Sequence, residues 1–452
     1  MDIEELLSRT EGKTLEFKRN AASPAGLLRT VAAFANTAGG TIVIGVDSRD
    51  RSIHDIADPL MEEERVANLV SDAIRPQLVV EIGIVAYRGK SLIVVEVFPG
   101  PARPYHVASD GMERGSYVRV GSTNRTAGPE VIAELRRANT GEAHDEQPLP
   151  RLDAEAIDYP AAVDQFESVR KLRRSDLLTL GVLRRIASRE VPTVGGVILF
   201  GKDRREMFPD AAIELGQFAG QDRTDLVDMQ TIDDMPIPAI DRALAVVLQQ
   251  TRERFTIRGS RRRSIGRVPE SALREAIVNA VVHADYSMRG SRIRIGVYAD
   301  RVEIDNPGLL PFGMTIDDMK AGHSKLRNRV LGRVFREVGL IEQWGTGIQR
   351  MTAACRAAGI ADPHLEELGT HFRVVFSFHP IARPALSERD TALLEALATH
   401  DNLSTAELAE ILQRTTRTVR NQLSRLVDTG HVTAVGSAPN DPRRTWRIVK
   451  GK

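Results

Sequence analysis

The chain has 452 residues, with 62 Lys and Arg, 61 Asp and Glu, one cysteine and 42% hydrophobic residues. This length predicts roughly two to four domains with buried cores. The formal net charge of +1 excludes a uniformly basic nucleic-acid coat, and the lone Cys355 excludes a disulfide framework or a multi-cysteine zinc site. The longest apolar runs have only strand length, and the opening residues carry no export-signal pattern, so we expect a cytoplasmic protein with no membrane partner.

Residues 1–136 alternate between helical and strand patterns, which predicts an α/β domain. The predicted helices are Ile3–Ser8, Pro24–Asn36 and Glu62–Ile74, and the predicted strands are Lys13–Arg19, Thr41–Val46, Leu78–Ala86, Lys90–Val97 and Tyr117–Val120. Residues 137–164 then become polar and rich in proline, which is typical of a linker.

Three carboxylates lie near the ends of the first two predicted strands: Glu11, Glu16 and Asp47. If these strands are neighbours, the carboxylates could converge at one edge of the sheet. Convergent carboxylates suit Mg²⁺ or Mn²⁺, which take oxygen ligands and promote phosphodiester hydrolysis. Acids at strand ends are also commonly solvated, so the spacing alone leaves both interpretations open.

Three segments of this region resemble the Schlafen, AlbA-type domain in the family's order: Glu11–Lys18, Phe34–Asp47 and Tyr117–Asn124. The resemblance implies a Schlafen-like α/β domain that binds nucleic acid. In Schlafen nucleases the positions of Glu11, Glu16 and Asp47 form a metal site, which implies the same role for these residues. Many bacterial nucleic-acid binders of this type keep the acids too, so the resemblance implies binding more firmly than cleavage.

Residues 165–379 return to α/β composition. The predicted strands are Val194–Phe200, Arg292–Tyr298, Arg301–Ile304 and Phe372–Phe378, and the predicted helices are Ile240–Arg254, Glu270–His283 and Ile348–Ala358. Glu275 and Asn279 share one face of a helix, since they are four residues apart. Gly345-Thr346-Gly347 precedes another helix, and the amides of such a loop can bind phosphate. A solvated helix face and a plain helix start are the alternatives.

Three segments, Arg274–Tyr286, Asp305–Gly308 and Trp344–Ile348, resemble the motifs of the GHKL ATPase superfamily. The version in bacterial RecG-like and transcriptional-regulator proteins, which also carry the Schlafen-type domain, is the most similar. The resemblance implies an α/β sandwich that binds ATP. It implies that Asn279 holds Mg²⁺ against the phosphates and that Glu275 is the general base for hydrolysis. The remaining implied nucleotide-binding residues are Asp305, which would accept from the adenine amino group, Gly308, which would let the chain approach the base, and Gly345, Thr346 and Gly347, which would line the phosphates.

Residues 384–452 predict a helix followed by a helix-turn-helix and a two-stranded wing. A Ser404–Glu407 capping box opens one helix, and Thr416–Val427 forms the next. From Leu412 onward there are nine Lys and Arg against two Asp, which favours a DNA-binding winged helix over one used for protein contacts. The predicted DNA contacts are Arg417, Arg420, Asn421, Arg425, Arg443 and Arg444.

The leading hypothesis is therefore a multi-domain α/β protein that binds ATP and DNA and regulates transcription. ATP occupancy would control the arrangement of its nucleic-acid-binding domains. An ATP-gated, metal-dependent nuclease acting on DNA or tRNA is the alternative, and a scaffold with a vestigial nucleotide site is the third. Since a winged helix reads half of a palindromic site, we expect a homodimer or a higher homo-oligomer.

Overall fold

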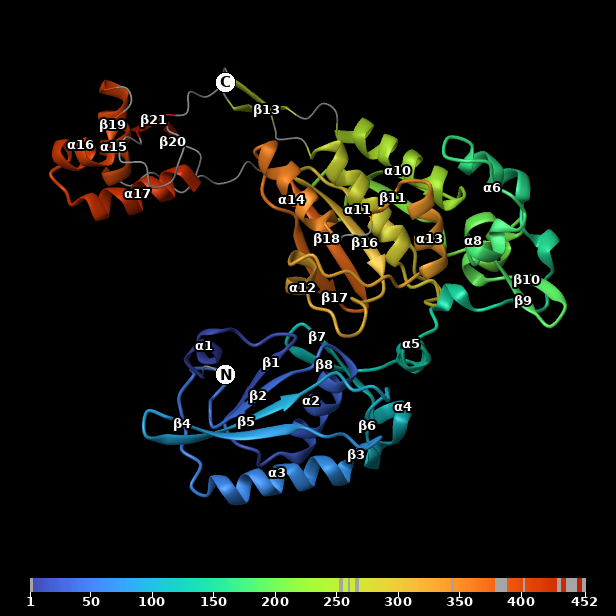
Figure 1. The fold of residues 1–452 in the computed structure, drawn as a ribbon, viewed down its shortest axis with the longest axis horizontal. Helices are drawn as coiled ribbons and strands as arrows, with labels where there is room; N and C mark the ends of the chain where they lie inside the picture. The colour runs from blue at the N-terminus through green and yellow to red at the C-terminus, as the bar shows by residue number, and fades with distance from the viewer. Residues whose placement is uncertain are drawn as a thin grey trace. The chain divides into compact units, whose positions relative to one another are not determined.

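The computed structural model describes residues 3–251, 255–258, 261–264, 268–342, 345–378, 388–400, 403–428, 432–435 and 445–448. The protein is a mixed α/β chain that forms two compact units, Met1–Pro380 and Ile381–Lys452 (Figure 1). Among the described residues, no helix has the length and apolar content needed to cross a bilayer. Each unit is described separately below.

The first part of the larger unit is an α/β layer. Its elements are α1 Ile3–Ser8, β1 Leu15–Lys18, α2 Pro24–Asn36, β2 Gly40–Ile44, α3 Pro59–Ala73, β3 Ile74–Arg75, β4 Glu81–Tyr87, β5 Lys90–Val97, β6 His106–Val107, α4 Gly111–Gly115, β7 Tyr117–Val120, β8 Thr123–Thr126 and α5 Pro129–Thr140. The main sheet has the order β1-β2-β5-β4, in which β1 and β2 are parallel and the other pairs antiparallel. The parallel register places Glu16 beside Ile42.

Nine of the thirteen residues of helix α2 are buried, and the helix organises this first part. Its apolar side chains pack with those of β2, β5 and α3 in one cluster. At its end, the Asn36 amide group donates to the carbonyl oxygens of Tyr105 and Tyr117, at 2.8 Å each, and accepts from the Tyr105 N–H at 2.7 Å. A buried amide with three backbone partners fixes the loops that lead into β6 and β7. The predicted helix Pro24–Asn36 is thus confirmed to the residue.

The central part of the larger unit contains the largest sheet. Its elements are α6 Tyr159–Phe166, α7 Asp176–Thr179, β9 Leu183–Ile186, β10 Arg189–Pro192, α8 Val194–Phe200, α9 Arg204–Met207, β11 Ile213–Phe218, β12 Leu226–Ile232, α10 Pro236–Thr251, β13 Phe255–Arg258, β14 Arg261–Ser264, α11 Glu270–His283, β15 Ile293–Val297, β16 Arg301–Pro307, α12 Ile316–Lys320, α13 Arg329–Glu337, α14 Gly347–Ala357, β17 His364–Leu368 and β18 His371–Ser377.

The six strands of this sheet follow the order β12-β11-β15-β16-β18-β17, with only the β11–β15 pair parallel among the described residues. Helix α11 packs against α10 on one side and α14 on the other, and it contacts β16 (Figure 1). One large cluster of buried apolar side chains joins these helices to the sheet. The arrangement is a two-layer α/β sandwich, because the apolar stripe of each helix needs a sheet to cover it.

The segment Val194–Phe200 is helical, so the prediction of a strand there is wrong. All seven of its residues are buried, and a fully apolar run of this length has no periodicity that separates a buried helix from a buried strand. The Thr193 hydroxyl accepts from the Gly196 N–H at 3.0 Å and caps the helix.

The predicted linker, residues 137–164, packs onto the central part instead of running free. Ile157 and Ala162 belong to its buried cluster. The carboxylate of Asp145 accepts from the N–H groups of Arg329, Val330 and Leu331, at 2.6–3.1 Å, and so caps α13. A polar, proline-bearing composition indicates a loop. It does not show whether that loop runs free or, as here, packs on a domain and caps a distant helix.

The smaller unit contains α15 Glu388–Thr399, β19 Leu403–Ser404, α16 Thr405–Ile411, α17 Thr416–Asp428, β20 Val432–Val435 and β21 Thr445–Ile448. Its sheet has the order β19-β21-β20 and is antiparallel. Leu397, Leu408, Leu423 and Trp446 form its core with their neighbours. The predicted capping box is confirmed, since Ser404 and Glu407 bond each other's backbone N–H groups.

Replacing Gly196 by alanine should lower the free energy of unfolding by about 1–3 kcal/mol, because an added Cβ would lie 2.1 Å from the carbonyl oxygen of Val182. Thermal or denaturant unfolding measures the change. Gly83 of β4 is the matched control, since an added Cβ there has no heavy atom within 4 Å. Equal destabilisation by the two substitutions would contradict the proposed packing of α8.

Candidate nucleotide-binding site

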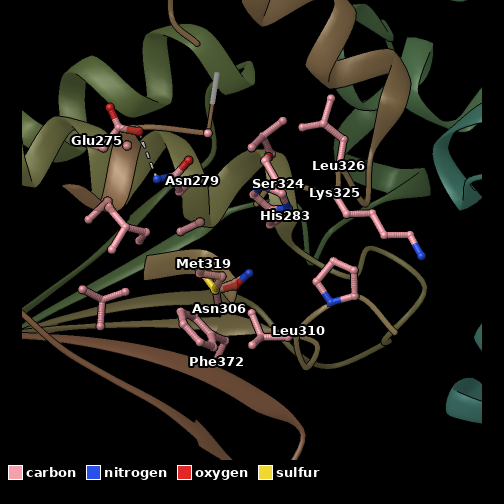
Figure 2. A pocket seen from close by; sticks show the side chains of 18 of the residues that line it. Glu275, Asn279, His283, Asn306, Leu310, Met319, Ser324, Lys325, Leu326 and Phe372 are labelled. Carbon is pink, nitrogen blue, oxygen red and sulfur yellow. Dashed lines mark hydrogen bonds between the residues drawn. The ribbon is translucent and has the colours of Figure 1, made fainter. Parts of the chain in front are cut away.

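A cavity of about 130 Å³ lies between α11, β16, β18, the start of α14 and the segment 308–327, which we call the lid segment (Figure 2). Most of its lining is apolar, with Ile304, Met319, Phe372 and Val374 among the contributing side chains. A concave apolar site with a few convergent polar groups is typical of small-molecule binding. The polar groups are described next.

Helix α11 supplies Glu275, Asn279 and His283 to the cavity, because residues four apart share one helix face. The Asn279 amide nitrogen donates to Glu275 at 3.2 Å, as Figure 2 shows, and Arg350 of α14 donates to the other carboxylate oxygen at 2.8 Å. The amide nitrogen of Asn279 is therefore used within the protein, which leaves its oxygen for a cation. Both oxygens of Glu275 are bonded in this arrangement.

The predicted loop Gly345-Thr346-Gly347 also lines the cavity, at the start of α14. Gly345 has a φ of +65°, and an added Cβ would lie 2.2 Å from the carbonyl oxygen of Gly322 in the lid segment. A Cβ on Gly347 would lie 2.1 Å from the Glu275 carboxylate. Glycine is needed at position 345, and a side chain at position 347 would displace the Glu275 carboxylate. The backbone N–H groups at a helix start can bind phosphate.

Asp305 does not line the cavity, so its predicted contact with the adenine amino group is not supported by its position. Its carboxylate pairs with Arg373 at 2.5 Å and with Arg223 at 3.1 Å. Burial alone would raise the pKa of Asp305, but Arg373 and Arg223 together hold it below its ordinary value. The strand periodicity explains the difference, because alternate residues of β16 point to opposite faces of the sheet.

Asn306, the next residue, lines the cavity and is labelled there in Figure 2. Its cross-strand neighbour is Phe372, which lines the same cavity, whereas the neighbour of Asp305 is Arg373. Sequence reasoning missed Asn306. Counting in steps of two from the buried Ile304 would have found it, since Ile304 and Asn306 share a face.

Gly308 follows β16 with a φ of +100° and lines the cavity as predicted. An added Cβ would lie 2.9 Å from the Asp285 Cβ and 3.2 Å from the Arg327 guanidinium. Arg327 in turn bonds the carbonyl oxygen of Leu309 and the carboxylate of Glu134 in α5. The two ends of the lid segment are thus tied to each other and to α5.

The lid segment also contacts the first part of the chain through Phe312. This ring packs in a cluster with Val118, Ala127, Ile132 and Leu135, and it is only 8% exposed. The next residue, Gly313, donates its N–H to the carbonyl oxygen of Thr37 at 3.0 Å. The segment that covers the cavity is therefore also a docking element for residues 1–136.

Glu367 of β17 reinforces this docking. Its carboxylate accepts from Lys13 at 2.7 Å and from the N–H of Leu310 at 2.9 Å. Burial lowers the pKa of Lys13, and the adjacent Glu367 partly offsets this effect. Lys13 lies between Glu11 and Glu16, so this N-terminal motif contacts β17, whose Glu367 also bonds the lid segment.

The three N-terminal carboxylates do not fit a metal site. Glu16 pairs with the buried Arg119 at 2.6 Å and with Lys18 at 3.0 Å. Glu11 accepts from the N–H of Phe17 at 2.8 Å, and Asp47 accepts from that of Arg49 at 2.9 Å. Within the described ranges, no group of three His, Cys, Asp or Glu side chains could hold a metal ion. Arg119 and Lys18 already supply the positive charge at Glu16 that the predicted Mg²⁺ or Mn²⁺ would have supplied.

In the smaller unit, Arg417, Arg420 and Asn421 are exposed on α17. Val419 and Leu423 of the same helix are completely buried, so the helix has one packed and one open face. Arg425 also lies in α17, and its side chain is outside the described part of the structure. Arg443 and Arg444 lie outside the described residues.

His283 lines the cavity, and burial lowers its pKa to about 4, with a further contribution from the positive charge of Arg327. The folded protein therefore keeps this ring neutral, while the unfolded chain binds a proton below an ordinary value of 6.5. Stability should be lost as the pH falls from about 6.5 towards 4. His283→Gln should lose less stability over this range in thermal unfolding, and His364→Gln, at an exposed position, should behave as wild type. A wild-type pH profile in His283→Gln would contradict this assignment.

Comparison with known sequence families matches three segments of the chain. Residues 11–128 match the family described as "Schlafen, AlbA_2", and residues 290–376 match the one described as "Putative ATP-dependent DNA helicase recG C-terminal". Residues 385–442 match the family HVO_A0114. The second match covers Asn306, Gly308 and the glycine loop, whereas α11 lies before it.

No curated protein matches the chain. Among solved structures, the DIP2311 protein of Corynebacterium diphtheriae is 17% identical, with a TM-score of 0.44 over 99% of this chain and 98% of that one. The N-terminal domain of a "Putative ATP-dependent DNA Helicase RecG-related Protein" from Nitrosomonas europaea is 26% identical, with a TM-score of 0.23 over 27% of this chain and 89% of that one. The family matches show that the chain combines a Schlafen, AlbA-type domain with a RecG-like C-terminal ATPase-type domain.

Proposed function

We propose that the protein is an ATP-binding and DNA-binding transcriptional regulator, in which nucleotide occupancy controls the arrangement of its nucleic-acid-binding domains. The observation that carries this proposal is the double role of the lid segment. It covers the cavity with residues such as Leu310 and Met319, and it docks on the first part of the chain through Phe312. A ligand that moves the lid segment therefore acts on this docking directly.

The cavity residues fit a nucleotide with its Mg²⁺. The glycine loop at the start of α14 would receive the phosphates, and the Asn279 amide oxygen would hold the cation. The bound cation would neutralise phosphate charge. Both oxygens of Glu275 are bonded to protein groups, so neither is free to act as a general base in this arrangement. The proposal therefore includes nucleotide binding but not hydrolysis. The sequence has no GxxxxGKS/T loop, so the proposal includes no helicase translocation.

The size of the cavity supports a coupled motion. Small-molecule sites commonly enclose about 300–1,000 Å³, and this cavity measures about 130 Å³. Admission of a nucleotide then requires the lid segment to shift, and the shift would change the contacts of Phe312, Gly313 and Leu310. A ligand can drive such a change only by its differential affinity for the two arrangements.

The smaller unit supplies the second nucleic-acid contact in this proposal. Helix α17 follows α16 after a short turn and exposes Arg417, Arg420 and Asn421, as a recognition helix in the major groove requires. The hairpin β20–β21 follows in the position of a wing. A protein that reads half-sites in this way would act as a homodimer or higher homo-oligomer. The N-terminal geometry gives no support to the nuclease alternative, since cations already neutralise Glu16.

ATP should change the affinity of the protein for a fluorescent DNA duplex at low salt, and DNA should change the affinity for ATP by the same factor. Phe312→Ala should bring this factor close to 1, because it removes the main apolar anchor of the lid segment. Titrations of each ligand with and without the other measure the factor. Phe98→Ala, at a position 53% exposed, is the control and should keep the wild-type factor. A wild-type factor of 1, or no ATP binding, would contradict the proposal.

Arg420→Ala should weaken DNA binding roughly tenfold and reduce the slope of log affinity against log salt by about 1, if the side chain neutralises one phosphate. Arg389→Ala is the matched control, since Arg389 is exposed on α15 outside the proposed recognition helix. Fluorescence anisotropy at several salt concentrations measures both quantities. Equal effects of the two substitutions would assign the smaller unit to protein contacts.

A further inference from the structure

Among the described residues that line the cavity, Asn306 carries a buried side-chain oxygen that no contact satisfies. The residue is only 6% exposed, and its amide oxygen is buried without a hydrogen-bond partner. Such groups are rare in proteins, because leaving a buried polar atom unpaired costs about 1–3 kcal/mol.

The surroundings of Asn306 define what could satisfy it. Asn306 shares the cavity lining with Met319 and with its cross-strand neighbour Phe372, which Figure 2 labels together with the Glu275–Asn279 pair. Apolar walls around a single amide suit a flat heteroaromatic ring whose edge carries hydrogen-bonding groups. Phosphates belong at the glycine loop, because the start of α14 attracts anions. The base of a bound nucleotide then lies at Asn306.

We propose that the Asn306 amide hydrogen-bonds to the group at position 6 and to N1 of a bound purine. This site would therefore bind 6-oxopurine nucleotides as well as adenine nucleotides. The inference rests on the proposed nucleotide site and assigns its base specificity. Asp305, which the motif places one residue earlier, is paired with Arg373 and Arg223 on the other face of the sheet. The reading group is therefore an amide and not a carboxylate.

The two polar atoms of an amide explain why both adenine and 6-oxopurine bases could bind. Adenine presents a donor at the 6-amino group beside an acceptor at N1, which match the amide oxygen and the amide nitrogen. A 6-oxopurine presents the reverse order, an acceptor at O6 beside a donor at N1. Rotation of the amide by about 180° matches this second pattern, and the amide oxygen has no hydrogen bond within the described residues that the rotation would break. A carboxylate offers acceptors only, so it could not match both edges.

The test compares ATP, ITP and purine riboside 5′-triphosphate, which carries hydrogen at position 6, by calorimetric titration with Mg²⁺. The wild-type protein should bind ATP and ITP within about tenfold of each other. It should bind purine riboside triphosphate at least about tenfold more weakly than either, which corresponds to one lost hydrogen bond. In Asn306→Leu, whose side chain has a similar shape, the three affinities should converge to within about threefold.

Asp305→Asn is the matched control and should keep the wild-type ratios, since Asp305 does not line the cavity. ITP binding more than 100-fold weaker than ATP binding would overturn the proposed tolerance. An unchanged ratio of ATP to purine riboside triphosphate in Asn306→Leu would overturn the assignment of Asn306. Failure of the wild-type protein to bind any of the three nucleotides would instead overturn the proposed function, so the two failures are distinguishable. The comparison of the three nucleotides uses the wild-type protein alone, so it stands even if Asn306→Leu does not fold.

Discussion

The carboxylate of Glu367 joins three parts of the larger unit. It is 4% exposed, and it accepts from Lys13 of the N-terminal motif and from the backbone of Leu310 in the lid segment. A buried charge is stable only when it is paired and hydrogen-bonded. The position of β17 therefore constrains both partners. The same carboxylate thus holds the start of the lid segment and the N-terminal motif at one strand, next to the docking of Phe312.

Much of the candidate nucleotide site could be predicted from sequence because its residues are close along the chain. The spacing of Glu275 and Asn279 determines a shared face of α11, and the helix begins and ends at the predicted residues. The glycine loop was predictable for a similar reason, since glycines before a helix allow close backbone approach. Both inferences need only local geometry.

The other features of the fold and the site depend on contacts between residues that are far apart in the sequence, or on which face of a strand is buried. The motif indicated Asp305, but the phase of β16 decides which side chain faces the cavity, and that phase selects Asn306. Residues 194–200 were misassigned because complete burial removes periodicity. The partner of Glu16 is Arg119, 103 residues later, and Lys13 meets Glu367 across 354 residues. Only the folded chain brings such pairs together, so the sequence indicated solvated acids by their spacing and a metal site by resemblance, and it gave no sign of these ion pairs.

The docking of Phe312 also bears on how such a protein could be assembled in evolution. The ring is buried against residues from β7, α5 and the loop before it, while Lys13 supplies a charge partner to Glu367. A central domain cut free from residues 1–136 would expose an aromatic side chain and leave a carboxylate without its cation. Separate transfer of the central domain would therefore carry a cost in stability at this shared boundary.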